Sequence, residues 1–215
     1  VAAPRSVVAR IACTAAIVVG TLITFVLTFL PWLNLSNIAL DISWNSYGSG
    51  EFQDGETPHA AAVRLAAAKA ASVAARYPRA LVVGSDQTAT LDGRTILGKP
   101  GGAVAARAQL RAASGRLMHF HTALALRRVE DGFVENLCVD TRVRFRRLDD
   151  RLIDAYLDAE QPWDCAGSAK SEGLGVILLE SIEGPDPTAL VGLPLIALTG
   201  ALMRAGVPLP GVPFD

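Results

Sequence analysis

Residues 80–100 read ALVVGSDQTATLDGRTILGKP. The apolar run at the start of this stretch predicts a buried strand, which delivers one carboxylate, Asp86, to its C-terminal end. Proteins of the α/β class commonly place their chemistry at such strand ends. Asp92-Gly93 is a tight-turn signal between two short β-prone runs, so the chain is expected to fold back and bring Lys99 toward Asp86. A carboxylate beside a lysine suits a metal ion bound together with a polyphosphate.

The same stretch also approaches the phosphate-binding P-loop pattern, because Gly93 is followed at the P-loop spacing by Gly98-Lys99. A P-loop continues with Ser or Thr, which holds Mg²⁺ and opens a helix. Pro100 occupies that position here. Proline has no N–H to donate and disfavours helix at the residue before it. A hairpin is therefore the preferred interpretation of this stretch.

The length of 215 residues allows one sizeable domain, and the formal net charge of -1 provides no global field to attract nucleic acid. The charges are unevenly spread, because residues 1–50 carry only Arg5, Arg10 and Asp41. Residues 51–215 have the charge content of an ordinary soluble domain. The sequence therefore predicts two parts, an atypical N-terminal segment (1–50) and a globular domain (51–215).

The cysteine and histidine side chains give weak signals. The cysteines are far apart and odd in number, so Cys13, Cys138 and Cys165 indicate neither a disulfide framework nor a zinc-finger spacing. A reducing, cytoplasmic compartment is the simplest fit. His119 and His121 lie two apart in an expected strand and therefore point to the same side. They could form a metal pair, but a structural or surface pair is the preferred interpretation.

Residues 11–33, IACTAAIVVGTLITFVLTFLPWL, contain no charged side chain and are long enough to span a bilayer. Arg5 and Arg10 precede them, which would leave the N-terminus inside. One interpretation is therefore an inner-membrane anchor formed by Ile11–Leu33. A second is a β-rich core segment, because Thr, Val and Ile are frequent in it.

Periodicity and breaker residues divide the rest of the chain into helices and strands. Residues 34–56 are polar and predict a loop, after which Thr57-Pro58 opens an alanine-rich helix. Alternation of polar and apolar residues along 133–145 predicts a sheet with one solvent-exposed face. The fold class is therefore α/β with a mixed sheet. The expected helices are 58–77, 103–113, 150–158 and 187–204, and the expected strands are 80–83, 117–129, 133–145 and 175–182.

A set of short motifs follows in a fixed order between Glu56 and Gly206. The motifs are RLA (64–66) with Lys69, GSDQ (84–87), LDG (91–93), GKP (98–100), CAGS (165–168), KSEG (170–173), GPDP (184–187) and VGLPL (191–195). In this order they resemble the Maf-like nucleotide pyrophosphatases. The resemblance implies a mixed twisted sheet with flanking helices and a cleft, as in Maf and ITPase-like folds, formed by residues 51–215.

The resemblance also implies an activity, a cofactor and site residues. Family members hydrolyse a nucleoside triphosphate to the monophosphate and pyrophosphate with a divalent metal cation, Mg²⁺ or Mn²⁺, and a homodimer is one assembly to be expected. Asp86 is implied as proton acceptor and metal ligand, and Lys69 and Lys99 as contacts of the polyphosphate. Gln87 and Glu172 look like the base-selecting residues of the subgroup that acts on 7-methyl-GTP.

The N-terminal part departs from the family pattern. Family members begin with a strand and a Ser-x-Ser-Pro-x-Arg-Arg loop, which is absent, and their Asp-Glu pair before the first long helix is also missing. Glu51 or Glu56 could supply one metal-binding carboxylate. Residues 1–50 are therefore interpreted as the product of a frameshift or wrong start in the gene, in preference to an anchor. The missing loop also supports an alternative function, a catalytically weak nucleotide-binding regulator linked to septum formation and cell division.

Overall fold

The computed structural model describes residues 52–208 and the backbone of residues 38–41. Five strands form one sheet in the order β1-β2-β3-β4-β5. β1 runs parallel to β2, and the other neighbouring pairs are antiparallel. The predicted mixed α/β class with flanking helices is confirmed. The strands are β1 (Ile38–Asp41), β2 (Leu81–Thr90), β3 (Leu117–Arg128), β4 (Phe133–Phe145) and β5 (Leu179–Glu183).

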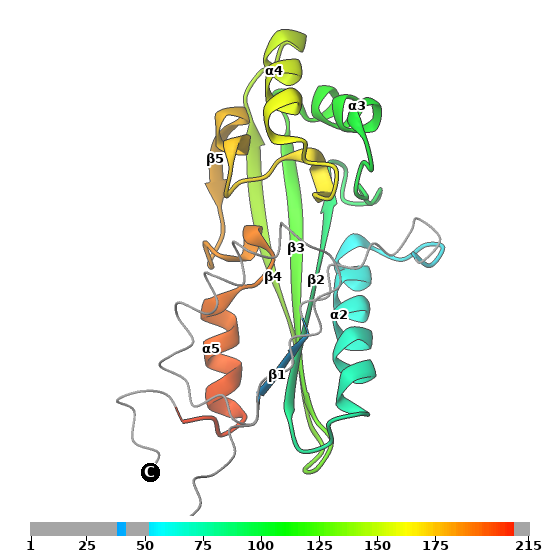
Figure 1. Ribbon diagram of the computed structural model, residues 1–215, viewed down its shortest axis with the longest axis vertical. Helices are drawn as coiled ribbons and strands as arrows, with labels where there is room; N and C mark the ends of the chain where they lie inside the picture. Colours follow the sequence, from blue (N-terminus) through cyan, green and yellow to red (C-terminus); the bar gives the residue numbers. More distant parts are fainter. Residues whose placement is uncertain (1–37, 42–51, 209–215) are drawn as a thin grey trace, which may run out of the picture.

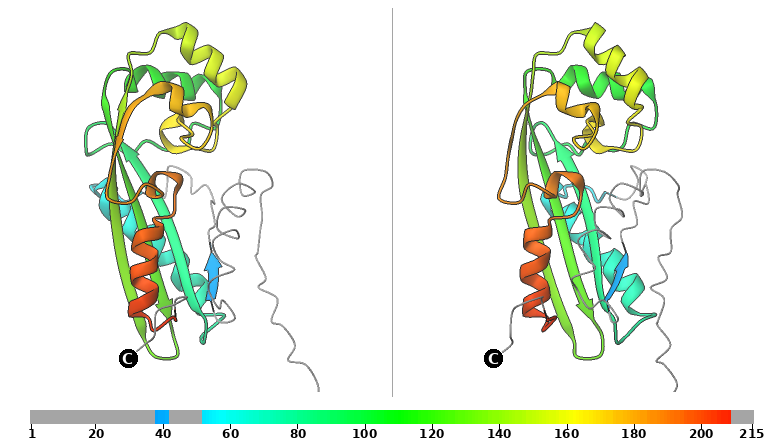
Figure 2. Two further views of the ribbon diagram at one scale, coloured as in Figure 1. Left: turned by 90° about the vertical axis from the view of Figure 1, so that its left-hand side faces the viewer. Right: turned by 60° about the vertical axis from the view of Figure 1, so that its left-hand side comes forward.

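Helices cover both faces of this sheet (Figure 1). α2 packs alone on one face, against small side chains of β2 and β3. On the opposite face, α3 and α4 cover one end of the long strands and α5 covers the other end (Figure 2). The helices are α2 (Pro58–Ala74), α3 (Ala103–Ala113), α4 (Asp150–Glu160) and α5 (Leu195–Arg204), with short 3₁₀ turns η3 (Ala166–Ser168), η4 (Leu174–Leu178) and η5 (Ala189–Val191).

The second of the two long strands, β4, follows the predicted alternation closely. β4 has the predicted bounds, Phe133–Phe145, and its buried positions Val139, Thr141, Val143 and Phe145 alternate with exposed charged residues. β3 ends at Arg128, where Asp131 accepts hydrogen bonds from the Arg128 guanidinium and from the Phe133 backbone N–H. These strands run the length of the molecule and join its two ends (Figure 1).

The prediction that Asp86 lies at the C-terminal end of its strand is wrong. β2 continues to Thr90, because β3 pairs with it along its whole length as far as His119. β1 stops earlier, with Asp41 opposite Gly84. Asp86 therefore lies in the middle of β2, two residues beyond the end of the parallel pair. On the side of β2 that faces β1, Asp86 still lies just beyond the end of a strand, where α/β proteins commonly place their chemistry.

Several other boundaries differ from the prediction. Residues 38–41 form β1, although 34–56 were predicted to be a loop. β5 begins at Leu179 because residues 174–178 form η4, and α5 begins at Leu195, after Pro194. The predicted anchor, residues 11–33, lies outside the described residues. Of residues 1–50, interpreted as a frameshift or wrong-start product, the structure describes only the backbone of β1. Within the described part of the chain, none of the helices combines the length and apolar character needed to cross a membrane.

Gly84 is the position where α2 comes closest to the sheet. A Cβ atom there would lie 2.5 Å from the Ala66 carbonyl oxygen and 2.7 Å from the Ala70 nitrogen, both backbone atoms of α2. We expect Gly84→Ala to lower the free energy of unfolding by about 3 kcal/mol, the upper part of the range for overpacked cores. The midpoint of thermal unfolding, measured by circular dichroism, checks this.

Gly98→Ala is the matched control, because no heavy atom lies within 4 Å of the Cβ position at Gly98 and its φ is not positive. Its melting temperature should stay close to that of the parent chain. Equal melting temperatures for Gly84→Ala and the parent would contradict the close approach of α2 to β2.

Candidate active site

The centre of the candidate site is an ion pair between α2 and β2. The Lys69 Nζ lies 3.0 Å from Asp86 Oδ2 and donates a hydrogen bond to the Ser85 carbonyl oxygen at 3.3 Å. The other carboxylate oxygen, Oδ1, accepts the Gln87 backbone N–H at 2.7 Å. The Lys69 side chain is only 5% exposed, and Asp86 is 16% exposed. A buried lysine beside a carboxylate is therefore built into the junction of helix and sheet.

The chain folds back after β2, as predicted, and Lys99 comes into electrostatic range of this pair. The Leu97 N–H donates to the Ala89 carbonyl at 2.7 Å, which returns the chain along the edge of β2. Asp92 holds the turn by accepting from the N–H groups of Thr95 (2.7 Å) and Arg94 (2.8 Å), and these bonds hold the pKa of its carboxyl well below the usual range. The segment is thus a hairpin and not a P-loop.

Electrostatic interactions place Lys99 in one group with Lys69 and Asp86. Burial lowers the pKa of Lys99 from its ordinary value. Asp164 and Asp86 oppose this shift, while the positive charge of Lys69 adds to it. Two lysines and a carboxylate therefore act on one another in a partly buried volume, which is an environment typical of functional sites.

Asp164 is a member of this group that the sequence reasoning did not single out. It lies in the loop after α4, beside Trp163, whose carbonyl accepts the Gly101 N–H at 2.9 Å. This bond ties the loop to the residue that follows Lys99 and Pro100. Trp163 packs against the core formed by α3 and α4. The glycine-rich composition of residues 161–175 was the available signal for a functional loop.

Gln87 points to the face of β2 opposite to Asp86, because neighbouring residues of a strand alternate. Its amide nitrogen lies 2.8 Å from Thr122 Oγ1 and 3.0 Å from the Ala189 carbonyl oxygen. Thr122 Oγ1 also donates to the Ala189 carbonyl, at 2.9 Å. Gln87 thus contacts η5, and the structure does not place it together with Asp86 and Lys69.

Glu172 lies in the loop between η3 and η4 and is exposed. Its carboxylate is 3.5 Å from the Ser171 hydroxyl and acts electrostatically on Cys165 and Lys170. Cys165 also acts electrostatically on Lys99, so the loop that carries Glu172 is linked through Cys165 to the group of Lys69, Asp86 and Lys99. None of the interactions described for residues 52–208 joins Glu172 directly to Asp86, Lys69 or Lys99.

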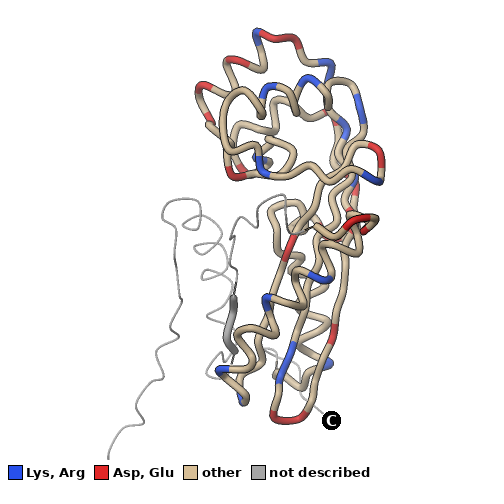
Figure 3. Tube along the Cα trace, turned by 90° about the vertical axis from the view of Figure 1, so that its right-hand side faces the viewer, with Lys and Arg blue, Asp and Glu red and all other residues tan. Residues whose placement is uncertain are grey.

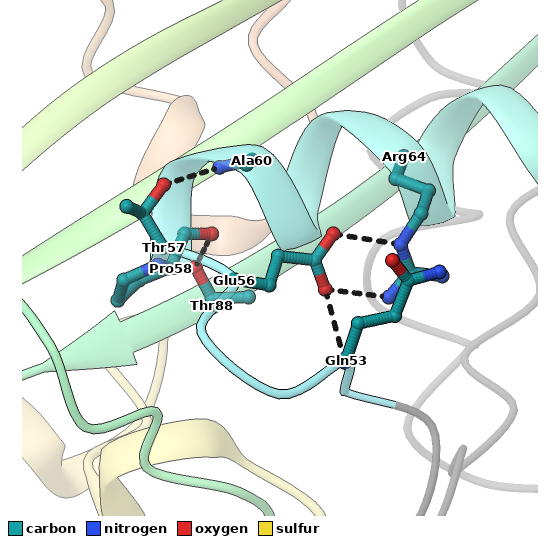
Figure 4. A network of polar contacts seen from close by, with 7 residues as sticks. All are labelled: Gln53, Glu56, Thr57, Pro58, Ala60, Arg64 and Thr88. Carbon is teal, nitrogen blue, oxygen red and sulfur yellow. Dashed lines mark hydrogen bonds and ion pairs between the residues drawn. The ribbon is translucent and has the colours of Figure 1, made fainter.

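Glu56 is already engaged in a structural network at the start of α2 (Figure 4). Its two oxygens accept from Arg64 Nε and Nη2, each at 2.7 Å, and Oε2 also accepts the Gln53 N–H at 3.3 Å. The hydrogen bonds from Arg64 lower the pKa of Glu56. The other predicted candidate, Glu51, lies outside the described residues.

A magnesium-type ion fits the donor set at Asp86. Mg²⁺ is commonly held by one or two carboxylates together with substrate phosphates, and the Asp86 carboxylate is of the type that this pattern needs. Figure 3 shows that acidic and basic residues are interspersed over the described chain, so the site lies in no extended field of one sign. The charges that would act on a bound polyphosphate are therefore the local ones of Asp86, Lys69 and Lys99.

Comparison with known proteins gives one consistent result. The profile of the Maf-like protein family matches residues 34–205. A Burkholderia pseudomallei protein named 7-methyl-GTP pyrophosphatase is 59% identical over 161 residues, which is 74% of each chain. Proteins of the same name from Bordetella avium and Bordetella pertussis are 56% and 55% identical, over 72% and 75% of this chain and 77% and 80% of their own length.

Proposed function

The chain belongs to the Maf-like protein family, and from this membership we propose that it is a nucleotide pyrophosphatase that hydrolyses 7-methyl-GTP to the monophosphate and pyrophosphate. The names of its relatives suggest the substrate. The observation that carries the proposal is the buried Lys69 ammonium 3.0 Å from Asp86, with Lys99 in electrostatic range. One carboxylate and two ammonium groups match the needs of an attacking water and a polyphosphate.

In the proposed reaction a water oxygen attacks the α-phosphorus of the nucleotide. The bond from this phosphorus to the bridging oxygen breaks, and its electron pair leaves with pyrophosphate. Asp86 accepts the proton of the water, which is the role of a general base. Lys69 and Lys99 bind phosphate oxygens as point charges and offset the negative charge that develops on the leaving group.

The family's divalent cation, Mg²⁺ or Mn²⁺, would be held by Asp86 and by the phosphate oxygens. When bound, it polarises the phosphoryl group and neutralises part of its charge. Phosphate oxygens entering the site also compete with Asp86 for the Lys69 ammonium. Nucleotide binding would thus loosen the ion pair and release the carboxylate for chemistry.

The direct test is pyrophosphate release by the purified full-length chain from 7-methyl-GTP, GTP and UTP, each with Mg²⁺ and with Mn²⁺. We expect turnover that depends on the cation and is fastest with 7-methyl-GTP. Nucleotide binding without pyrophosphate release would overturn the proposed hydrolysis. That result would instead support a nucleotide-binding regulator linked to septum formation and cell division.

This second function is favoured by one observation in the sequence. The family's Ser-x-Ser-Pro-x-Arg-Arg loop follows its first strand, whereas the residues after β1 contain no Lys or Arg until Arg64. Arg64 itself is bound to Glu56. Phosphate binding in this chain then depends more strongly on Lys69 and Lys99.

Glu172 is proposed to select the base, because its carboxylate can accept from guanine N–H groups while opposing the positive charge of the 7-methylated ring. We expect Glu172→Gln to lower the ratio of kcat/KM for 7-methyl-GTP to that for UTP by about tenfold, the loss of one charge-assisted hydrogen bond. Steady-state kinetics with both nucleotides measure the ratio. Glu180→Gln, on an exposed residue of β5, is the matched control, and an equal ratio in both variants would remove Glu172 from the base pocket.

A further inference from the structure

A second group of potential metal ligands lies on the sheet beside the first turn of α2. His59 is the second residue of that helix, and Cys138 and Asp140 alternate along β4. One ligand atom from each of these three residues lies within 4.8 Å of the other two. The three donors, a nitrogen, a sulfur and an oxygen, therefore converge on one point from two different elements.

His121 holds the carboxylate of this group in place. It lies opposite Asp140 in the register of β3 and β4, and its Nδ1 is 2.6 Å from Asp140 Oδ1. Its ring also meets the His59 ring edge to face, with centroids 5.7 Å apart. One carboxylate oxygen is thus occupied and the other is left to bind an ion. Hydrogen bonds of this kind orient the ligands of natural metal sites.

The position of His59 is fixed independently of any ion. The Thr88 hydroxyl donates to the carbonyl oxygen of Pro58 at 2.8 Å, and the Thr57 hydroxyl caps the helix by accepting the Ala60 N–H at 3.2 Å (Figure 4). The first turn of α2, which carries His59, is therefore held against the sheet by these two hydrogen bonds. Little ordering remains to be done when an ion binds, which favours affinity.

This ligand group is distinct from the candidate active site. Asp86 lies opposite Ala123 on β3, and Ala123 lies opposite Cys138 on β4, so one full strand separates the two positions. The donor types also differ. Asp86 offers oxygen alone, which suits Mg²⁺, whereas imidazole and thiolate select zinc and related transition metals.

We propose that His59, Cys138 and Asp140 bind one zinc-class divalent ion, with His121 as the positioning residue of Asp140 and water in the fourth position. Three protein ligands with one open position form a standard tetrahedral zinc arrangement. On binding, the Cys138 sulfur forms a bond to the ion and its proton passes to solvent. The bound ion joins the first turn of α2 to β4, and α2 carries Lys69.

Burial explains why Cys138 stays a thiol when no ion is present. Burial, together with the smaller effect of the Asp140 charge, raises the pKa of the Cys138 thiol to about 12.

Cobalt titration of the reduced full-length chain tests the site, because a Co²⁺–thiolate bond gives a charge-transfer absorption in the near ultraviolet that oxygen ligands do not give. We expect one Co²⁺ per chain with this absorption, displaced by Zn²⁺ and not by Mg²⁺. Cys138→Ser should abolish the absorption, while the matched controls Cys165→Ser and Cys13→Ser should keep it. Persistence of the band in Cys138→Ser would overturn the proposal.

Histidine variants test the remaining geometry with the same titration. His59→Ala should weaken Co²⁺ affinity by more than tenfold, and His121→Ala by about 10- to 100-fold, the range for residues that orient a ligand. His119→Ala is the control, because His119 lies on the same face of β3 and belongs to neither group. Circular dichroism without metal verifies that each variant is folded, and unchanged affinity in a folded His59→Ala would contradict the site.

Discussion

Asp86→Asn is expected to lower kcat for 7-methyl-GTP hydrolysis by about 100-fold or more, the effect of removing a general base. The amide keeps the shape of the side chain and can still accept the Gln87 N–H that Asp86 Oδ1 accepts at 2.7 Å. It cannot take the proton of the attacking water, and it binds a divalent cation poorly. The loss should therefore appear in turnover, with the fold preserved.

Pyrophosphate release under saturating substrate measures the effect, and thermal melts establish that the variant is folded. Asp158→Asn, an exposed carboxylate on α4, is the matched control and should retain parental turnover. If folded Asp86→Asn keeps kcat within a factor of about three of the parent, Asp86 does not act as the base.

Much of the sheet could be predicted because its signal is local. The alternation of Val139, Thr141, Val143 and Phe145 with charged residues sets β4, whose predicted bounds match the structure. β1 was missed because it has only four residues within a polar stretch, and its partner, β2, lies far along the chain. A short parallel strand of this kind is defined by its pairing and not by its own composition.

The extent of β2 was underestimated for a related reason. The strand was predicted from the apolar run 80–83 alone. Gly84 is required by the close approach of α2, and Ser85 Oγ lies 2.8 Å from the carbonyl oxygens of Ala123 and Gly192. Both residues are small or polar because of tertiary contacts. Local propensity cannot register such contacts, so the strand was predicted to end too early.

In the candidate sites, too, the features set by local sequence could be predicted and those set by tertiary contacts could not. The hairpin is local, so the approach of Lys99 to Asp86 could be predicted from its turn residues. The ligand group of His59, Cys138 and Asp140 depends on the register of β3 with β4 and on where α2 begins above them. Spacing in the sequence does not contain that register, and the cysteines therefore gave no metal signal.

Lys69→Met is expected to lower kcat/KM by about 100-fold, which corresponds to about 2.7 kcal/mol of lost transition-state stabilisation. Methionine fills most of the space of a side chain that is only 5% exposed, so the packing of α2 is retained. The variant loses the ammonium that would bind the polyphosphate. It also leaves the Asp86 carboxylate without the charge now 3.0 Å away, which should lower the free energy of unfolding by about 3 kcal/mol.

The double variant Lys69→Met with Asp86→Asn separates these two roles. If Lys69 served only to neutralise Asp86, removing both charges would restore stability and would leave activity no lower than in Asp86→Asn alone. We expect stability to recover, because neither partner of the Lys69–Asp86 ion pair is left charged without the other, while KM rises above that of Asp86→Asn because the phosphates have lost a cation. Lys170→Met is the matched control for stability. It breaks the partly buried ion pair in which Lys170 Nζ lies 3.3 Å from Glu160 Oε1, so it measures what the loss of such a pair costs. A KM in the double variant equal to that of Asp86→Asn would show that Lys69 does not contact the substrate, and phosphate binding would then rest on Lys99.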